Sequence, residues 1–478
     1  MNRQSTPTTL AQHSGSGSWL DGLTRREFLQ TGAAGVGALT ALGPARATGA
    51  PVPVANRRPN LLLIIADQMN LDALSCLGNP HVRTPHFDRL AARGTLFTES
   101  HSTNPVCSPA RSSLMTGRMP VETGVTVNDR AIRSGMPNLG EWLSARAGYE
   151  TAYAGKWHLP GGIFAPSFAG FRALPGGGGQ GALDDGWVTR SCEAWLRAYA
   201  GRQGAAPFCL VASYMQPHDI CYWMIHPETL VPDRLPFPQL AAALPALPPN
   251  HRSRPPGPDR ARNAYTRFPN DDAWRYYLYC YYRMVEMLDH DVGRLLDALD
   301  DTGLAENTLV VFTSDHGEGA GRHGNVQKWH PYDESMKVPL LCALPGRVRQ
   351  AARDTEHLVS GLDVMSTFCD YAGTAAPPAA RGLSLRPLLE GRRVEWRDVL
   401  VCEWQRVGRI VRTPQYKLVT YGDDPAVQLF DLRADPWETT NLAGETRYAD
   451  TIREHRARLQ DWNGRMDVCP EPPGKGGA

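Results

Sequence analysis

The chain has 478 residues, a formal net charge of +1 at neutral pH and 42% hydrophobic residues. This length and apolar content suffice for one large domain or a few medium domains with a substantial core. Because the net charge is close to zero, no overall basic field attracts nucleic acid or a membrane surface, and any anion-binding site must be local.

The first 47 residues are predicted to be an export signal that is not part of the fold. Arg25 and Arg26 precede a weakly apolar run from Thr31 to Leu42, and Ala45 and Ala47 are the small residues of a cleavage site. The run is shorter than the roughly 20 residues of a membrane-spanning helix, and no apolar segment of that length follows it. These features predict a bacterial protein that the twin-arginine translocase exports to the periplasm or the medium, without a stable membrane anchor.

Four short apolar runs predict strands of a parallel sheet that is buried on both faces. Each run ends in polar side chains that are suited to catalysis: Asp67 and Gln68, Lys156 and His158, His218, and Asp315 and His316. In a sheet of this kind the ligand crevice lies outside the carboxyl ends of the strands. We therefore expect these side chains to meet at one edge of the sheet.

Helices and loops are predicted between these strands. A helix is predicted within residues 282–304, after a tyrosine-rich segment, because Met284, Leu288 and Leu295 have the spacing of a core-packed helix and Gly303 is a natural end for it. Residues 169–186 and 232–258 lack periodicity and are predicted to be loops, either walls of an active site or disordered segments.

The ten cysteines form no C-x-x-C pair, which argues against a structural zinc site. We expect most of them to be buried. Some could form disulfides after export, and their spacing does not determine which would pair.

From about residue 375 the pattern changes to short strand-like pieces with turn residues between them, followed by a helix near residues 448–463. The predicted fold is therefore α/β, with a large, mostly parallel central sheet flanked by helices in a catalytic domain of residues 57–376. A smaller α+β subdomain, built on an antiparallel sheet, is predicted for residues 377–478.

The segment C-S-P-A-R at residues 107–111, followed by T-G-R, resembles the signature of type I sulfatases of the alkaline phosphatase superfamily. G-K-W-H at residues 155–158 and S-D-H-G at residues 314–317 follow in the family's order, and residues 428–443 resemble its C-terminal subdomain. The resemblance covers most of the chain after the signal. It implies that a formylglycine-generating enzyme oxidises Cys107 to formylglycine.

The chemistry explains why such a family needs this residue. A thiolate that attacked sulfur would leave a persistent adduct, whereas a hydrated aldehyde offers one hydroxyl to attack and a second whose deprotonation ejects sulfate. Pro109 suits the first turn of a helix, because its missing N–H needs no partner there. The helix N-terminus then presents free N–H groups to an anion at Cys107.

The resemblance also implies roles for six other residues. Arg111 would stabilise the formylglycine hydrate and His158 would contact it, while Lys156 and Lys328 would hold sulfate oxygens. His218 would protonate the leaving oxygen, and Asn128 would face the substrate. For Lys328 and His218, a role as solvated or hydrogen-bonded loop residues is the alternative.

A divalent metal is implied as well, with Asp67, Gln68, Asp315 and His316 as its protein ligands. Oxygen ligands favour a hard cation, so we expect Ca²⁺ first and Mn²⁺ second, because His316 supplies nitrogen. Gln68 departs from the many sulfatases that carry a second aspartate there; choline sulfatases and phosphonate monoester hydrolases carry glutamine. The departure leaves the metal and the preference for sulfate over phosphate open.

The prediction for function is an exported sulfatase that hydrolyses sulfate esters, with carbohydrate sulfates as the first substrate class and small sulfated molecules as the second. One alternative is a phosphonate or phosphate diester hydrolase of the same superfamily. The other is an inactive relative that binds anionic polysaccharide without turnover.

Overall fold

The computed structural model describes residues 58–177, 179–226, 230, 234–258, 268–404, 406, 408–422 and 424–470. The predicted export signal lies outside the described residues. Within them, no helix combines the length and the apolar character that crossing a bilayer requires.

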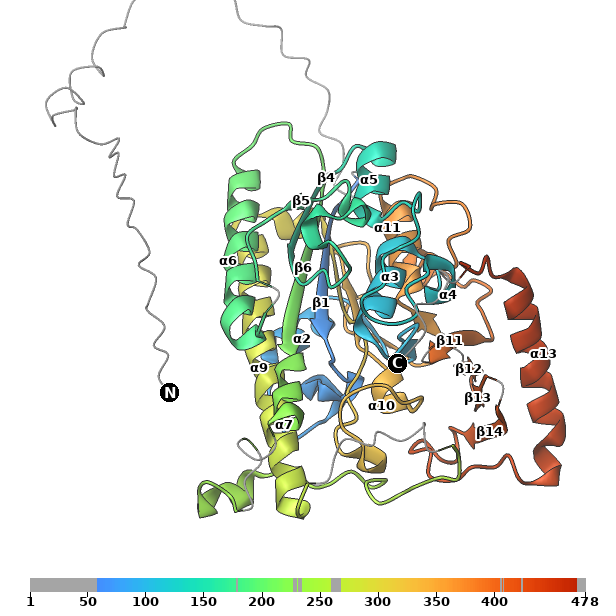
Figure 1. Ribbon diagram of the computed structural model, residues 1–478. Helices are drawn as coiled ribbons and strands as arrows, with labels where there is room; N and C mark the ends of the chain where they lie inside the picture. Colours follow the sequence, from blue (N-terminus) through green and yellow to red (C-terminus); the bar gives the residue numbers. More distant parts are fainter. Residues whose placement is uncertain are drawn as a thin grey trace, which may run out of the picture. The chain divides into compact units, whose positions relative to one another are not determined.

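An eight-stranded sheet lies at the centre, in the order β5-β4-β6-β1-β7-β8-β2-β9 (Figure 1). β1 pairs in parallel with β6 and β7, whereas β8 runs antiparallel to its neighbours β7 and β2. The four predicted apolar runs are β1, β4, β6 and β7, so the mostly parallel sheet is confirmed. The strands are β1 (Asn60–Asp67), β2 (Thr95–Phe97), β4 (Glu150–Gly155), β5 (Arg172–Ala173), β6 (Phe208–Pro217), β7 (Thr308–Ser314), β8 (Leu340–Ala343) and β9 (Ala352–Asp354).

Helices cover both faces of this sheet. Figure 1 shows α6 (Gly181–Ala200) and α9 (Asp271–Asp301) on one side of β1 and β6, and α3 (Cys107–Thr116), α5 (Leu139–Ala147) and α11 (Leu362–Tyr371) on the other. With α2 (Pro85–Ala92), the first group encloses a core that includes Ile64, and the second encloses a core that includes Ile65. Adjacent residues of β1 thus point into opposite cores, which is why the strand is apolar at nearly every position.

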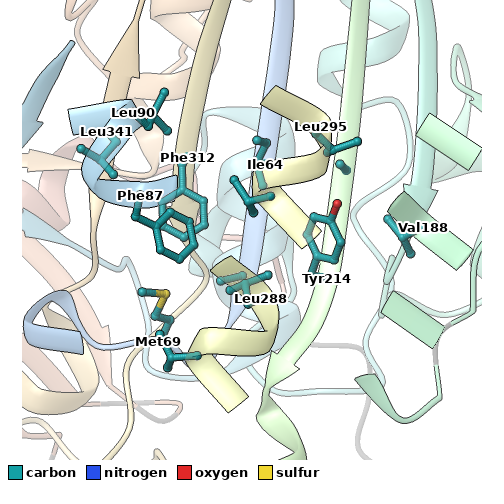
Figure 2. Close-up of a cluster of buried hydrophobic side chains, with 14 of the residues drawn as sticks. Ile64, Met69, Phe87, Leu90, Val188, Tyr214, Leu288, Leu295, Phe312 and Leu341 are labelled. Atoms are coloured by element: carbon teal, nitrogen blue, oxygen red, sulfur yellow. The ribbon is translucent and has the colours of Figure 1, made fainter. Parts of the chain in front are cut away.

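The first of these cores shows how strand and helix side chains meet. In Figure 2, Ile64 of β1 and Phe312 of β7 lie among Leu288 of α9 and Phe87 of α2. The rings of Phe87 and Phe312 have centroids 4.3 Å apart. Side chains that the sequence spacing placed on one face of a helix therefore do pack on the sheet.

Two helix boundaries differ from the predicted ones. α9 begins at Asp271, capped by Asn270 on the N–H of Ala273, so it includes the tyrosine-rich segment that precedes the predicted helix. α6 begins at Gly181, inside the predicted loop of residues 169–186. The carboxylate of Asp219 accepts the first N–H groups of α6, at 3.0 Å from Gly181 N and 2.8 Å from Ala182 N. Because the residue that caps α6 lies 38 residues from its first residue, the sequence near Gly181 carries no signal for a helix start.

The C-terminal part contains a four-stranded antiparallel sheet with its strands in sequence order. The sheet and the final helix were predicted, and this part of the fold class is confirmed. The sheet packs on Tyr332, Met336 and Leu358 of the preceding chain, and the division at residues 376 and 377 stays a prediction. Its elements are β11 (Leu400–Trp404), β12 (Gly408–Arg412), β13 (Tyr416–Tyr421), β14 (Asp424–Asp431) and α13 (Ala449–Arg465).

The remaining elements are short. β3 (Ser100–His101) and β10 (Val359–Ser360) form a two-stranded sheet, and the short helices are α4 (Pro120–Thr123), α7 (Tyr222–Ile225), α10 (Asp333–Met336) and α12 (Arg386–Leu389). All ten cysteines lie in described residues, none is disulfide-bonded there, and seven are buried.

Candidate active site

Cys107 is the first residue of α3 and is fully buried. The N–H of Ser108, in the first turn of the helix, donates to Asn128 Oδ1 at 3.1 Å. The Cys107 Sγ lies 2.9 Å from Lys328 Nζ, 3.2 Å from His316 Nε2 and 3.8 Å from Asp67 Oδ1. The structure therefore brings the ends of β1 and β7 to the N-terminus of α3.

The surroundings of Cys107 favour an anion. Burial and Asp67 act to raise the pKa of the Cys107 thiol, but the positive charges of Lys156 and Lys328 act to lower it, and the pKa lies well below its ordinary value. A negatively charged group at this position would be stabilised by the same cations.

Arg111 forms hydrogen bonds to residues at the ends of several strands of the central sheet. Its Nε donates to Asp315 Oδ2 at 2.9 Å, its Nη2 donates to Asp67 Oδ2 at 3.0 Å, and its Nη1 donates to the Lys156 carbonyl at 2.9 Å and to Ser213 Oγ at 2.7 Å. Lys156 Nζ lies 2.5 Å from Asp67 Oδ2. Arg111 thus fixes one oxygen of each carboxylate. Asp315 Oδ1 accepts from the N–H groups of Gln68 and His316, at 3.1 Å and 2.9 Å, whereas Asp67 Oδ1 faces Cys107 Sγ.

Three of the four predicted metal ligands lie together. Ligand atoms of Asp67, Asp315, His316 and Cys107 are all within 4.8 Å of one another, and all four residues are buried. His316 Nδ1 is 2.8 Å from the Gly317 carbonyl, so Nδ1 carries the proton and the lone pair of Nε2 faces the cluster. Two carboxylates and one neutral imidazole are a donor set that suits a divalent cation.

The fourth predicted ligand, Gln68, bridges two groups that lie beside this cluster. Its Oε1 accepts from Lys328 Nζ at 3.0 Å, and its Nε2 donates to Glu318 Oε2 at 2.5 Å. The backbone at Gln68 has a φ of 72°, and its carbonyl accepts from Tyr281 of α9 at 3.0 Å. The orientation of the amide is therefore set by Glu318.

Glu318 is a site residue that the sequence did not point out. It is fully buried, and its Oε1 accepts from the Tyr277 hydroxyl at 2.7 Å and from the N–H of Gln327 at 2.5 Å. Burial raises its pKa, whereas these donors and Gln68 act to lower it. Glu318 follows directly after S-D-H-G, and nothing in the sequence ties it to the tyrosines of α9.

The remaining predicted residues lie at the rim of the cluster. His218 Nε2 is 4.0 Å from Asp67 Oδ1. Burial and Lys328 act to lower the pKa of His218, but Asp67, Cys221 and Cys107 together raise it to about 9. The side chain of His158 is exposed, while its carbonyl accepts from Ser108 Oγ at 2.5 Å. The contact of His158 with the nucleophile stays a prediction.

Comparison with known proteins gives the family. The family model described as Sulfatase matches residues 59–374, and the one described as N-sulphoglucosamine sulphohydrolase, C-terminal, matches residues 321–464. A Delta 4,5-hexuronate-2-O-sulfatase of Bacteroides thetaiotaomicron is 31% identical over 441 residues, 85% of this chain and 89% of the relative.

Two solved structures resemble the fold. A 2-O GAG sulfatase is 27% identical, with a TM-score of 0.75 over 86% of this chain and 92% of the other. The phosphonate monoester hydrolase of Agrobacterium radiobacter is 24% identical, with a TM-score of 0.68 over 85% and 96% of the two chains, and shows the shared fold. With its buried cysteine, carboxylates and cations at one sheet edge, the chain belongs to the sulfatase family and is a sulfuric ester hydrolase.

Proposed function

We propose that this enzyme hydrolyses sulfate esters of carbohydrates through a formylglycine made from Cys107. The observation that carries the proposal is the position of the Cys107 Sγ, 2.9 Å from Lys328 Nζ at the N-terminus of a helix and beside a cluster of metal-ligand atoms. A formylglycine hydrate at this point would supply the hydroxyl that attacks sulfur.

The residues around it have complementary roles. Lys156 and Lys328 hold the sulfate oxygens, and Arg111 keeps Asp67 and Asp315 in place. As the ester S–O bond breaks, His218 gives its proton to the oxygen of the leaving alcohol. Asn128 holds the first turn of α3 and faces the substrate, and His158 contacts the hydrate from the open side of the site.

Asp67, Asp315 and His316 would hold a divalent metal, with Ca²⁺ first and Mn²⁺ second, and Gln68 would be its fourth protein ligand. When bound, the metal supplies positive charge to the reacting oxygens. Removing one preorganised donor from an anionic transition state costs about 100- to 1,000-fold in rate. Lys156, Lys328 and His218, the cationic side chains that would contact the sulfate ester, should therefore each make a measurable contribution to the rate.

The substrate class rests on two relatives. A hexuronate-2-O-sulfatase and a 2-O GAG sulfatase both act on sulfated sugars by their names, and each is aligned with more than four fifths of this chain. Export through the twin-arginine translocase, by the signal of residues 1–47, would bring the catalytic domain of residues 57–376 and its subdomain, residues 377–478, to extracellular polymers.

The first test is the mass of the tryptic peptide that contains Cys107, from protein made together with a formylglycine-generating enzyme. Conversion to formylglycine or its hydrate is expected. A plain thiol in the presence of an active modifying enzyme would refute the proposed nucleophile.

The second test compares substrates on the converted enzyme. Release of sulfate from 2-O- and 6-O-sulfated sugars is expected to exceed release from choline sulfate and 4-nitrophenyl sulfate. Gln68 favours a second candidate, because glutamine at this position is also found in phosphonate monoester hydrolases. Faster turnover of a phosphonate monoester or a phosphodiester would support that candidate, and binding without hydrolysis would favour an inactive polysaccharide-binding protein.

A further inference from the structure

Lys328 lies between two residues with strained backbones. Gln327 has a φ of 60° and Trp329 a φ of 81°, in the left-handed region that side chains with a Cβ rarely adopt. Such conformations persist only where the surrounding structure holds them. The position of Lys328 Nζ beside Cys107 therefore depends on the contacts of its two neighbours.

Each neighbour is held by its backbone. On one side, Gln327 N–H donates to Glu318 Oε1 at 2.5 Å, and its carbonyl accepts from Gly319 N at 2.6 Å. On the other side, the carbonyl of Trp329 accepts from the indole Nε1 of Trp404 at 2.9 Å. Trp404 ends β11 of the C-terminal sheet and is 1% exposed.

The end of β11 also contacts the segment before the nucleophile. Glu403 N–H donates to the Thr103 carbonyl at 2.7 Å, and Trp329 N–H donates to the Pro105 carbonyl at 3.4 Å. The two segments that carry Lys328 and Cys107 are thus bonded to one another and to adjacent residues of β11, the first to Trp404 and the second to Glu403.

We propose that Trp404 is a positioning residue of the active site, whose indole N–H holds the Trp329 carbonyl and thereby keeps Lys328 Nζ at Cys107. The inference rests on the proposed function, in which Lys328 holds sulfate oxygens. It gives the C-terminal sheet a part in catalysis through a residue that does not touch substrate.

Trp404→Phe removes the donor and keeps an aromatic ring. Trp396→Phe is the matched control, because Trp396 Nε1 donates to the Leu358 carbonyl at the same 2.9 Å without contact to the Lys328 segment. With the converted, metal-loaded enzyme and its best sulfate ester, Trp404→Phe is expected to lower kcat/KM about tenfold, part of the 100- to 1,000-fold effect of losing a donor. Trp396→Phe is expected to stay within about twofold of wild type, since its donor has no link to the site.

A double-mutant cycle separates positioning from general damage. In the Lys328→Ala background, Trp404→Phe is expected to have little further effect on kcat/KM, because the side chain it positions is gone. Trp404→His keeps a ring N–H and is expected to retain more activity than Trp404→Phe; it also serves if the phenylalanine variant does not fold.

Several results would overturn the inference. They are a Trp404→Phe enzyme within twofold of wild type, an effect that persists undiminished without the Lys328 side chain, or a histidine variant no better than phenylalanine. If Lys328→Ala itself leaves hydrolysis unchanged, the proposed role of Lys328 fails first. If instead Lys328→Ala lowers hydrolysis but Trp404→Phe does not, Lys328 acts in catalysis and its position does not depend on Trp404.

Discussion

Replacing Gln68 by glutamate tests whether Glu318 dictates an amide at this position. The change is isosteric and leaves the carbonyl-side contact, in which Lys328 Nζ lies 3.0 Å from Oε1. It replaces only the Nε2 donor, which lies 2.5 Å from Glu318 Oε2, by an oxygen. Both side chains are fully buried, so two carboxyl groups would face each other without water.

The magnitude follows from the lost bond and from proton uptake. A hydrogen bond to a charged group contributes about 1.5–3 kcal/mol, which sets the lower end of the expected loss. Facing carboxyls raise the pKa of one of the two above the ordinary glutamate value of about 4.3. The folded variant then binds more protons than the unfolded chain, so its free energy of unfolding falls by up to about 1.4 kcal/mol per pH unit as pH rises through this range.

Unfolding midpoints in urea, measured without metal between pH 5 and pH 8, are the assay. Gln68→Glu is expected to be close to wild type at pH 5 and about 2–4 kcal/mol less stable at pH 8. The control is Gln68→Glu combined with Glu318→Gln, which restores one acid and one amide and should recover at least about 1 kcal/mol. A single variant as stable as wild type at pH 8, or a double variant no better than the single one, would refute the reasoning.

Three further predictions concern other parts of the molecule. Cys107→Ala removes the nucleophile, so hydrolysis of the best sulfate ester should fall by at least about 1,000-fold while the melting temperature changes little; residual turnover near wild type would exclude Cys107 from the chemistry. Chelation with EDTA should abolish turnover, and Ca²⁺ should restore it better than Mn²⁺ in a metal titration, whereas full activity after verified metal removal would contradict the proposed metal site. Burial raises the pKa of Glu403 to about 7. The free energy of unfolding of the wild type should therefore fall by up to about 3 kcal/mol relative to Glu403→Gln as pH rises from about 4.3 to 7, and curves that stay parallel over this range would contradict the prediction.

The fold was predictable wherever a local pattern decides it. The apolar runs that became β1 and β7 carry their own signal, because a strand buried on both faces is apolar at nearly every position. The start of α6 was not predictable, because its first N–H groups bond to Asp219, which comes 38 residues after Gly181. The start of α9 was missed for a different reason, since a run of tyrosines has no strong helix preference of its own.

The candidate site divides in the same way. Cys107, Asp67, Asp315 and His316 follow motifs whose residues lie at a helix start or a strand end, and the structure brings them within 4.8 Å of one another. Glu318 and Trp404 had no such signal. Their contacts with the site depend on how a loop meets α9 and how β11 meets the Lys328 segment, and both are products of tertiary packing.

The contact between Gln68 and Glu318 explains why a neutral side chain suits position 68. An aspartate at position 68 would have to share a buried space with Glu318, whose partners Tyr277, Gln327 and Gln68 all donate to it. The Gln68 amide instead donates from Nε2 to Glu318 and accepts from Lys328 Nζ at Oε1. The Gln68 amide therefore lies between the carboxyl group of Glu318 and the ammonium group of Lys328. A bound metal would meet two carboxylates rather than three, so its positive charge would be less neutralised and more of it would act on the oxygens of the substrate.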